Sequence, residues 1–283
     1  MSNYTCTGIF VAFLLCLLSS SIYASETNQD IKKLLEEDRY EEAISKMELL
    51  PRKDTISSAR VLNALGWAYL KLGNYQKAKD NLQASYELAK KLDNQEVAVI
   101  SSNNLGILAY LENDLEKAEK YFYIGKRKNS RTALTYLDLI EKKNRNIRFQ
   151  EALLNGIDLR RKQDFKGAIG NYEKALSIQP NDAATLEYKG YALLRDGQHD
   201  LSVKTLDKAK TLDPTRKFVY LNLVKAYCML QSDQDVQQSI IESSLEIDEF
   251  VQWYAADSEF RKMCSNSTYI YYSYMIFSLK KPV

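Results

Sequence analysis

One spacing pattern recurs four times along the chain and limits what it can fold into. Four glycines are each followed, twelve residues later, by a small side chain and, four residues beyond that, by a large apolar one. The glycines are Gly66, Gly106, Gly156 and Gly190, the small residues Ala78, Ala118, Ala168 and Ser202, and the large ones Leu82, Phe122, Tyr172 and Leu206. Seven residues after each glycine stands a turn-type or polar residue: Gly73, Asn113, Gln163 and Gly197. The pattern predicts two helices joined by a tight turn, with small residues where they approach most closely.

Two helical stretches end in prolines, Pro180 and Pro214, which lie 34 residues apart, as do Gly156 and Gly190. Each proline is expected to stop the helix that precedes it. The order of residues in this part of the chain resembles the tetratricopeptide repeat. The residues that carry the resemblance are Leu186, Gly190, Leu193, Ser202, Leu206, Ala209 and Pro214 in one unit, and Gly156, Ala168, Tyr172, Ala175 and Pro180 in the preceding one.

The resemblance implies an all-α solenoid of helical hairpins, wound as a right-handed superhelix and closed by a C-terminal capping segment. The array would occupy residues 25–249, with units near 24–57, 59–92, 99–132, 149–182, 183–216 and 217–250. Gly106 and Gly156 are 50 residues apart, so we expect an inserted helical segment near residues 132–148 and a break or kink around residue 140. Residues 250–283 would form the capping helix and an aromatic tail, because an end unit must cover the last apolar face.

The first 24 residues carry no charge, and residues 8–18 form an apolar run too short to span a bilayer comfortably. With Ala24 at the cut, residues 1–24 resemble a secretory signal peptide, although the first seven residues lack the usual Lys or Arg. We therefore predict a periplasmic or secreted protein, the alternative being an uncleaved membrane anchor. Export leaves Cys228 and Cys264 as the mature cysteines, and without a local signal that they meet, separately buried thiols are favoured over a disulfide.

Composition excludes several classes of function. The chain has one histidine, His199, which argues against Ser-His-Asp triads and histidine-based zinc sites. Its 39 basic and 37 acidic residues leave a net charge of +2, too balanced for a whole-chain nucleic-acid binder. Gly-rich phosphate loops and paired-cysteine metal motifs are missing from the sequence. We predict a protein that is not an enzyme and that needs no cofactor or metal.

In the tetratricopeptide repeat family, the first helices of the repeats line a groove in which peptides or helices commonly bind. Carrying this register over, the predicted groove residues are Asn63, Trp67, Asn104, Tyr110, Arg160, Tyr188, Tyr191, Arg195, Asn222 and Lys225. The asparagine amides suit a peptide backbone because they both donate and accept hydrogen bonds, and Asn104 and Asn222 are expected outside the core. Some members clamp a C-terminal carboxylate with Lys and Asn, but Asn63, Gln150 and Leu154 at the corresponding positions argue against that clamp.

A second candidate surface is the segment between Lys126 and Lys162, which holds eleven Lys or Arg and four Asp or Glu. Such a segment could meet an acidic partner. The predicted function is therefore that of an adaptor or scaffold for a peptide or protein partner. The alternatives are a peptide-sensing regulatory protein of the same repeat family and an assembly factor anchored in the membrane by the N-terminal segment.

Overall fold

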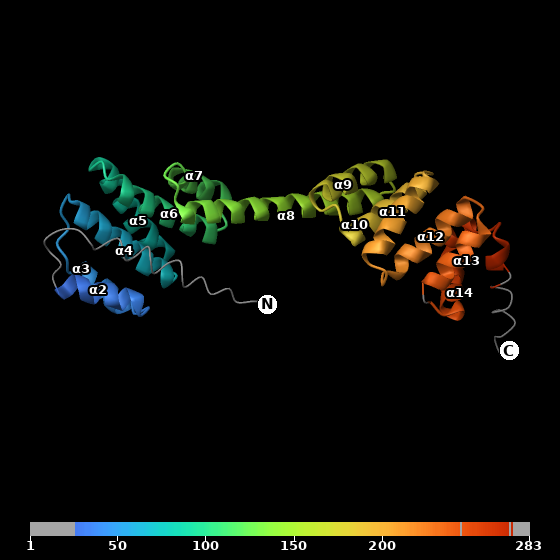
Figure 1. Cartoon of the computed structure of the whole chain (residues 1–283), viewed down its shortest axis with the longest axis horizontal. Helices are drawn as coiled ribbons and strands as arrows, with labels where there is room; N and C mark the ends of the chain where they lie inside the picture. Colours follow the sequence, from blue (N-terminus) through green and yellow to red (C-terminus); the bar gives the residue numbers. More distant parts are fainter. Residues whose placement is uncertain (1–25, 244, 272, 274–283) are drawn as a thin grey trace. The chain divides into compact units, whose positions relative to one another are not determined.

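The computed structural model describes residues 26–243, 245–271 and 273, and the regular elements within these ranges are all α-helices (Figure 1). The chain divides into two compact units, Met1–Lys142 and Lys143–Val283, so their boundary lies inside the 31-residue helix α8 (Arg131–Arg161). The expected signal segment and most of the aromatic tail at residues 269–279 lie outside the described residues. In the ranges that are described, none of the helices has both the length and the apolar character needed to cross a membrane.

Unit 1 is a stack of helical hairpins in which each helix packs against the next. Its helices are α2 (Glu26–Glu36), α3 (Tyr40–Glu48), α4 (Ile56–Lys71), α5 (Tyr75–Lys91), α6 (Gln95–Leu111), α7 (Leu115–Lys126) and the beginning of α8. The first helices of two successive hairpins, α4 and α6, also contact each other. This is the arrangement of a solenoid, in which stacked hairpins share one continuous core.

The repeated glycines bring the two helices of a hairpin into contact, as the spacing predicts. A Cβ built on Gly106 would lie 2.8 Å from the ring of Phe122, and one built on Gly156 would lie 2.6 Å from the ring of Tyr172. Both rings are fully buried, so the space next to each glycine is taken by the large residue sixteen positions later. Ala168, between Gly156 and Tyr172 in sequence, is also fully buried.

The turns inside the hairpins share one geometry. The residue seven positions after each glycine adopts a left-handed conformation, with φ of 75° at Gly73, 64° at Asn113, 64° at Gln163 and 80° at Gly197. The residue after it caps the second helix in three of the four hairpins, where Asn74, Asp114 and Asp164 accept a hydrogen bond from a backbone amide three residues on. The corresponding Gln198 makes no such side-chain hydrogen bond.

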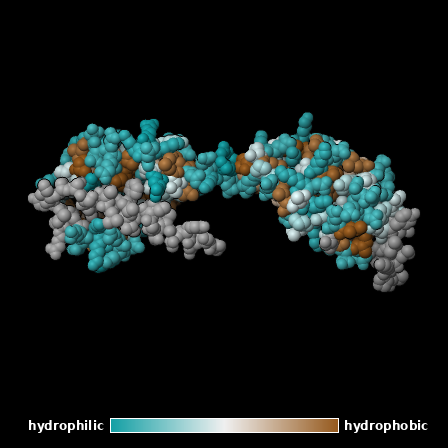
Figure 2. Space-filling model, viewed as in Figure 1, coloured by the Kyte–Doolittle hydropathy of each residue, from teal (hydrophilic) through white to brown (hydrophobic). Residues whose placement is uncertain are grey.

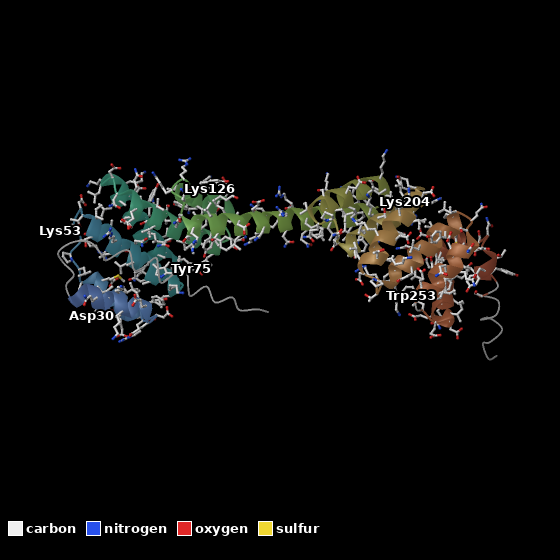
Figure 3. The ribbon with its side chains drawn as sticks, in the orientation of Figure 1. Asp30, Lys53, Tyr75, Lys126, Lys204 and Trp253 are labelled. Carbon is white, nitrogen blue, oxygen red and sulfur yellow. A yellow bond between two sulfur atoms is a disulfide. The ribbon has the colours of Figure 1, made fainter. Side chains whose placement is uncertain are left out.

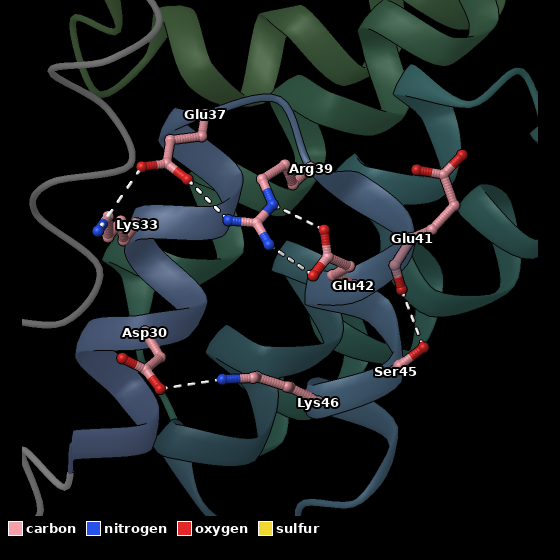
Figure 4. Close-up of polar contacts among 8 residues, drawn as sticks. All are labelled: Asp30, Lys33, Glu37, Arg39, Glu41, Glu42, Ser45 and Lys46. Atoms are coloured by element: carbon pink, nitrogen blue, oxygen red, sulfur yellow. Dashed lines mark hydrogen bonds and ion pairs between the residues drawn. The ribbon is translucent and has the colours of Figure 1, made fainter.

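Surface ion pairs join the first two helices of unit 1 (Figure 4). Arg39 precedes α3 and donates from Nε and Nη2 to the carboxylate of Glu42, at 2.6 Å each. Lys46 of α3 reaches Asp30 of α2 at 2.9 Å. These hydrogen bonds, donated to the Glu42 carboxylate, raise the pKa of Arg39 above its ordinary value. All these groups are exposed, so they orient α2 on α3 more than they stabilise the contact.

Unit 2 continues the same hairpin arrangement from the second part of α8. Its further helices are α9 (Phe165–Ile178), α10 (Ala183–Arg195), α11 (His199–Leu212), α12 (Lys217–Met229), α13 (Asp233–Glu242), α14 (Ile247–Ala256) and α15 (Ser258–Met263). The first helices α10 and α12 contact each other, like their counterparts in unit 1. Residues 132–148, expected to form an inserted helical segment, lie within α8, which continues to Arg161.

The C-terminal helices cover the apolar face of the last hairpin. Phe250 and Val251 of α14, Phe260 of α15 and Ile270 are buried in one cluster with side chains of α12 and α13. Cys228 of α12 and Cys264, directly after α15, form a disulfide with their Cα atoms 5.0 Å apart. The expectation of two separate thiols was therefore wrong. The two cysteines are 36 residues apart in sequence, and no local pattern connects them.

Candidate functional site

In unit 1, the predicted groove residues lie on α4 and α6. Asn104 donates from Nδ2 to Oδ1 of Asn63 at 3.0 Å, so two of the predicted amides are paired with each other. Asn63 is buried, whereas Asn104, Trp67 and Tyr110 are half-buried. The ammonium of Lys71 lies 5.8 Å from the centre of the Trp67 ring, a distance suited to a cation–π contact. These side chains of α4 and α6 therefore form a surface of aromatic rings and side-chain amides.

In unit 2, five of the ten predicted groove residues line a single pocket of about 460 Å³, which we call the Arg160 pocket. Its walls come from α8, α10, α12, α14 and α15 and from the loops next to them. The lining residues are Arg160, Glu187, Tyr188, Tyr191, Arg216, Phe218, Leu221, Asn222, Lys225, Trp253, Asp257, Glu259 and Phe260. Asn222, expected outside the core, is 9% exposed, because α12 is covered on this side by the C-terminal helices.

The C-terminal segment supplies acidic partners for the predicted basic groove residues. Lys225 Nζ lies 2.6 Å from Asp257 and 3.6 Å from Glu259. Arg195 forms an ion pair with Glu259 and donates to the hydroxyl of Tyr191 at 2.9 Å, and this hydroxyl donates to Glu259 at 3.0 Å. These contacts attach α15 to the first helices of unit 2.

Burial changes the acidity of groups in the Arg160 pocket. Desolvation raises the pKa of Glu187 above its ordinary value, although Arg216 opposes the shift through an ion pair at 2.7 Å. Desolvation would raise the pKa of Asp257 too, but hydrogen bonds from Lys225 and from the amides of Phe260 and Glu259 outweigh it, so that pKa lies below its usual value. Desolvation also raises the pKa of the Tyr191 phenol. The titratable groups of the pocket are therefore partly desolvated.

Arg160 differs from the other basic side chains of this pocket. Its guanidinium carbon lies 5.2 Å from the ring centre of Tyr188 and 5.7 Å from that of Tyr191. Its Nε is buried and has no hydrogen-bond partner among the described residues. Within the same part of the chain, no carboxylate lies within ion-pair distance of its guanidinium. The group contacts aromatic faces and forms no ion pair with a described residue, although its charge opposes the rise in pKa that desolvation causes at Glu187 and at the Tyr172 phenol.

Two aromatic side chains of the Arg160 pocket lie partly in solvent. Phe218 at the start of α12 is 53% exposed and Trp253 of α14 is 40% exposed, and their rings meet edge to face with centres 5.4 Å apart. Figure 3 labels Trp253, and Figure 2 shows hydrophobic side chains reaching the surface over α14. Sequence reasoning assigned Trp253 and Asp257 to a cap and did not consider Phe218 or Arg216. Only packing of the cap on α12 brings these residues beside Arg160.

The basic segment is partly neutralised within its own helix. Lys142 of α8 pairs with Asp138 at 2.7 Å, and Lys162, directly after α8, pairs with Asp158 at 2.6 Å, each partner lying four residues earlier on α8. In unit 2, Arg145 and Arg148 line a second pocket of about 630 Å³ together with Lys174 of α9. Its other lining residues are Glu151, Ala152, Asn155, Asn171, Ser177 and Ile178. An acidic partner at this segment stays a prediction.

Within the described ranges, no three His, Cys, Asp or Glu side chains converge as ligands for a metal ion. The single histidine, His199, begins α11 and is half-buried at the turn between two helices. The Arg160 pocket combines charged groups, aromatic faces and an amide, which is the chemistry of a recognition surface.

Comparison with known proteins supports the fold. Family models described as tetratricopeptide repeat match residues 37–91, 57–123 and 153–217. The chain is similar to the TPR2AB domain of yeast Sti1, solved as a complex with pHSP90, at 19% identity over 89% of this chain and 97% of that one, with a TM-score of 0.52. It is also similar to the type IV pilus biogenesis factor PilW, at 14% identity over 78% and 93% of the two chains, with a TM-score of 0.37. No curated protein sequence matches the chain significantly.

Proposed function

Because the chain belongs to the tetratricopeptide repeat family, we propose that it is a non-catalytic scaffold whose first helices bind a segment of a partner protein. Proteins of this family are protein-interaction scaffolds. The observation that carries the proposal is the Arg160 pocket, where Arg160, Tyr188, Tyr191, Asn222 and Lys225 from three successive first helices converge. Convergence of aromatic and arginine side chains in a partly desolvated site is typical of the residues that dominate protein–protein affinity.

The described helices of unit 1 offer a second contact surface of the same kind. Trp67 and Tyr110 are half-buried on neighbouring first helices, beside the Asn63–Asn104 pair. An aromatic ring that is already half-packed loses little conformational freedom when a partner covers its remaining face. A partner segment would bind to each unit through its own first helices.

The protein is further proposed to act outside the cytoplasm, after removal of residues 1–24. The disulfide between Cys228 and Cys264 supports this location, because such bonds persist in oxidising compartments and are rare in the cytosol. Intact-mass analysis of fractionated cells tests the proposal, with a chain beginning near Ser25 in the envelope or the medium as the expected result. A cytoplasmic chain that retains Met1 would contradict export, and one that retains Met1 in the membrane fraction would favour the anchored alternative.

Partner binding is tested by quantitative affinity capture from the compartment in which the chain is found. Tyr110→Ala on α6 and Tyr188→Ala on α10 each remove an aromatic face from a first helix. Tyr75→Ala is the matched control, because Tyr75 is exposed at the start of the second helix α5. We expect the first-helix variants to lose captured partner by about tenfold or more while the control does not. Equal capture by all three variants would contradict binding on the first helices.

A further inference from the structure

Resting on this scaffold function, we propose that the Arg160 pocket binds one carboxylate of a partner protein together with an apolar side chain next to it. The charges in and beside the pocket carry the first half of the inference. Four cations of unit 2 come together here: Arg160, Arg195, Arg216 and Lys225. Three carboxylates accompany them: Glu187, Asp257 and Glu259. Three of these four cations form ion pairs with the three carboxylates.

The fourth cation, Arg160, forms no ion pair with a described residue. Glu187 is engaged by Arg216, Asp257 by Lys225, and Glu259 by Arg195. Arg160 contacts aromatic faces instead, and its Nε is buried without a hydrogen-bond partner in the described ranges. A buried donor that lacks an acceptor is costly, and a carboxylate supplies two acceptor oxygens in the planar geometry of a guanidinium. The structure thus holds a donor set that one carboxylate would complete.

The environment strengthens such a bond. Tyr188 and Tyr191 contact the guanidinium with ring centres 5.2 Å and 5.7 Å from its carbon, and its Nε is buried, so the group is partly shielded from water. Charge-assisted hydrogen bonds are stronger where water is excluded, because the local dielectric constant is lower. A ligand carboxylate reaching Arg160 would therefore gain more than it would from an arginine on an open surface.

The second half of the inference concerns the apolar wall. Phe218 and Trp253 form an exposed edge-to-face pair in the lining of the pocket, beside the buried Leu221. A carboxylate alone would leave these rings in water, whereas an adjacent Leu, Ile, Phe or Trp side chain would cover them. The volume of about 460 Å³ falls in the usual range of ligand pockets and is larger than a carboxylate group requires.

The same charges exclude a polyanion as the occupant. Glu187, Asp257 and Glu259 line the same pocket as Arg160 and would repel a second and a third negative charge. A strand of nucleic acid or a run of several acidic residues therefore fits less well than a single acid next to an apolar residue. This chemistry occurs both as an acidic side chain within a segment and as the α-carboxylate of an apolar C-terminal residue.

Selection from random octapeptides tests the inference and separates the two sources. The full chain, with its disulfide intact, is used to select from one library displayed with a free C-terminus and one displayed as an internal segment. Wild type is expected to enrich Asp or Glu beside an apolar residue in the internal library, or an apolar C-terminal residue in the free library. Arg160→Gln should lose that preference. Arg161→Gln is the matched control, because Arg161 is the exposed neighbour on the same helix and carries the same charge.

Calorimetry on a synthetic copy of the enriched peptide supplies the magnitude. Arg160→Gln, or replacement of the peptide's acid by its amide, is expected to weaken binding about tenfold to hundredfold, the range for a hydrogen bond to a charged group. Arg160→Lys keeps the positive charge but lacks the planar fork of the guanidinium, so it should weaken binding by less than Arg160→Gln. It replaces Arg160→Gln as the test variant if the glutamine variant folds poorly.

The inference is overturned if wild type shows no preference for a carboxylate, or if Arg160→Gln and Arg161→Gln select the same peptides as wild type. The scaffold function has a separate test. Partner capture that is lost on Tyr110→Ala or Tyr188→Ala but unchanged by Arg160→Gln would leave scaffold binding in place and remove only the carboxylate site.

Discussion

The contact between Gly156 and Tyr172 is the sharpest test of how the hairpins pack, because a nearby glycine provides an internal control. A Cβ on Gly156 would lie 2.6 Å and 2.7 Å from two carbons of the Tyr172 ring. Gly170 lies within α9, and a Cβ there meets nothing within 4 Å. Gly156→Ala and Gly170→Ala thus make the same chemical change on neighbouring helices, with and without a steric obstacle.

The magnitude follows from two opposing effects. Replacing a helical glycine by alanine stabilises the helix by about 1 kcal/mol, and Gly170→Ala is expected to gain close to that amount. At Gly156 the same gain is opposed by overpacking, which costs about 1–3 kcal/mol. Because Tyr172 is fully buried and its ring cannot swing away, we expect the upper half of that range. Gly156→Ala should therefore destabilise unit 2 by about 1–2 kcal/mol, and the two variants should differ by about 2–3 kcal/mol.

Urea unfolding followed by tryptophan fluorescence measures the effect in unit 2 alone. The chain has two tryptophans, so Trp67→Phe in every sample leaves Trp253 of unit 2 as the sole reporter. This separation is needed because two compact units need not unfold in one step. Equal shifts of the midpoint in the two variants, or a stabilised Gly156→Ala, would refute the close approach of α8 to α9.

Three further outcomes are expected. Gln198→Asn should stabilise unit 2 by about 0.5–1 kcal/mol in urea unfolding, because Gln198 occupies the cap position of α11 without a side-chain cap, and an unchanged midpoint would contradict this. Replacing Cys228 and Cys264 together by Ala should cost about 3–4 kcal/mol, from the entropy of closing a loop across a separation of 36 residues, and added reductant should destabilise wild type but not the variant. Hydrogen bonds from Ser267 and Thr268 hold the pKa of Asp233 below its ordinary 3.8, so its stabilising effect is present above that pH and is lost as the pH falls through the folded value. Asp233→Asn should therefore lower the melting temperature at pH 7 but not near pH 2, and an equal loss at both would exclude ionisation of Asp233 as the cause.

The hairpin architecture could be predicted from the sequence because the same packing contact recurs wherever the same residue spacing recurs. A large buried residue such as Phe122 requires a partner position without a Cβ, and Gly106 supplies it sixteen residues earlier. The left-handed turn requires a residue that tolerates positive φ, which explains why Gly73 and Asn113 occupy equivalent positions. The path of α8 could not be predicted in the same way. The insertion before Gly156 has no counterpart in the other units, so no repeated pattern showed that it continues into the following helix.

The proposed binding site shows which features the repeat register does not predict. Repetition placed Arg160, Arg195 and Lys225 on first helices, and it treated them as equivalent groove residues. The C-terminal helices break that equivalence, because Glu259 pairs with Arg195 and Asp257 with Lys225, and neither carboxylate has a counterpart in the earlier repeats. A repeat pattern describes the positions that a solenoid presents, but it contains no information on which of them the chain covers with its own end. Three-dimensional packing distinguishes Arg160 as the groove cation without a carboxylate partner among the described residues, and the proposal that it binds a partner therefore depends on the charges of the cap as much as on the repeats.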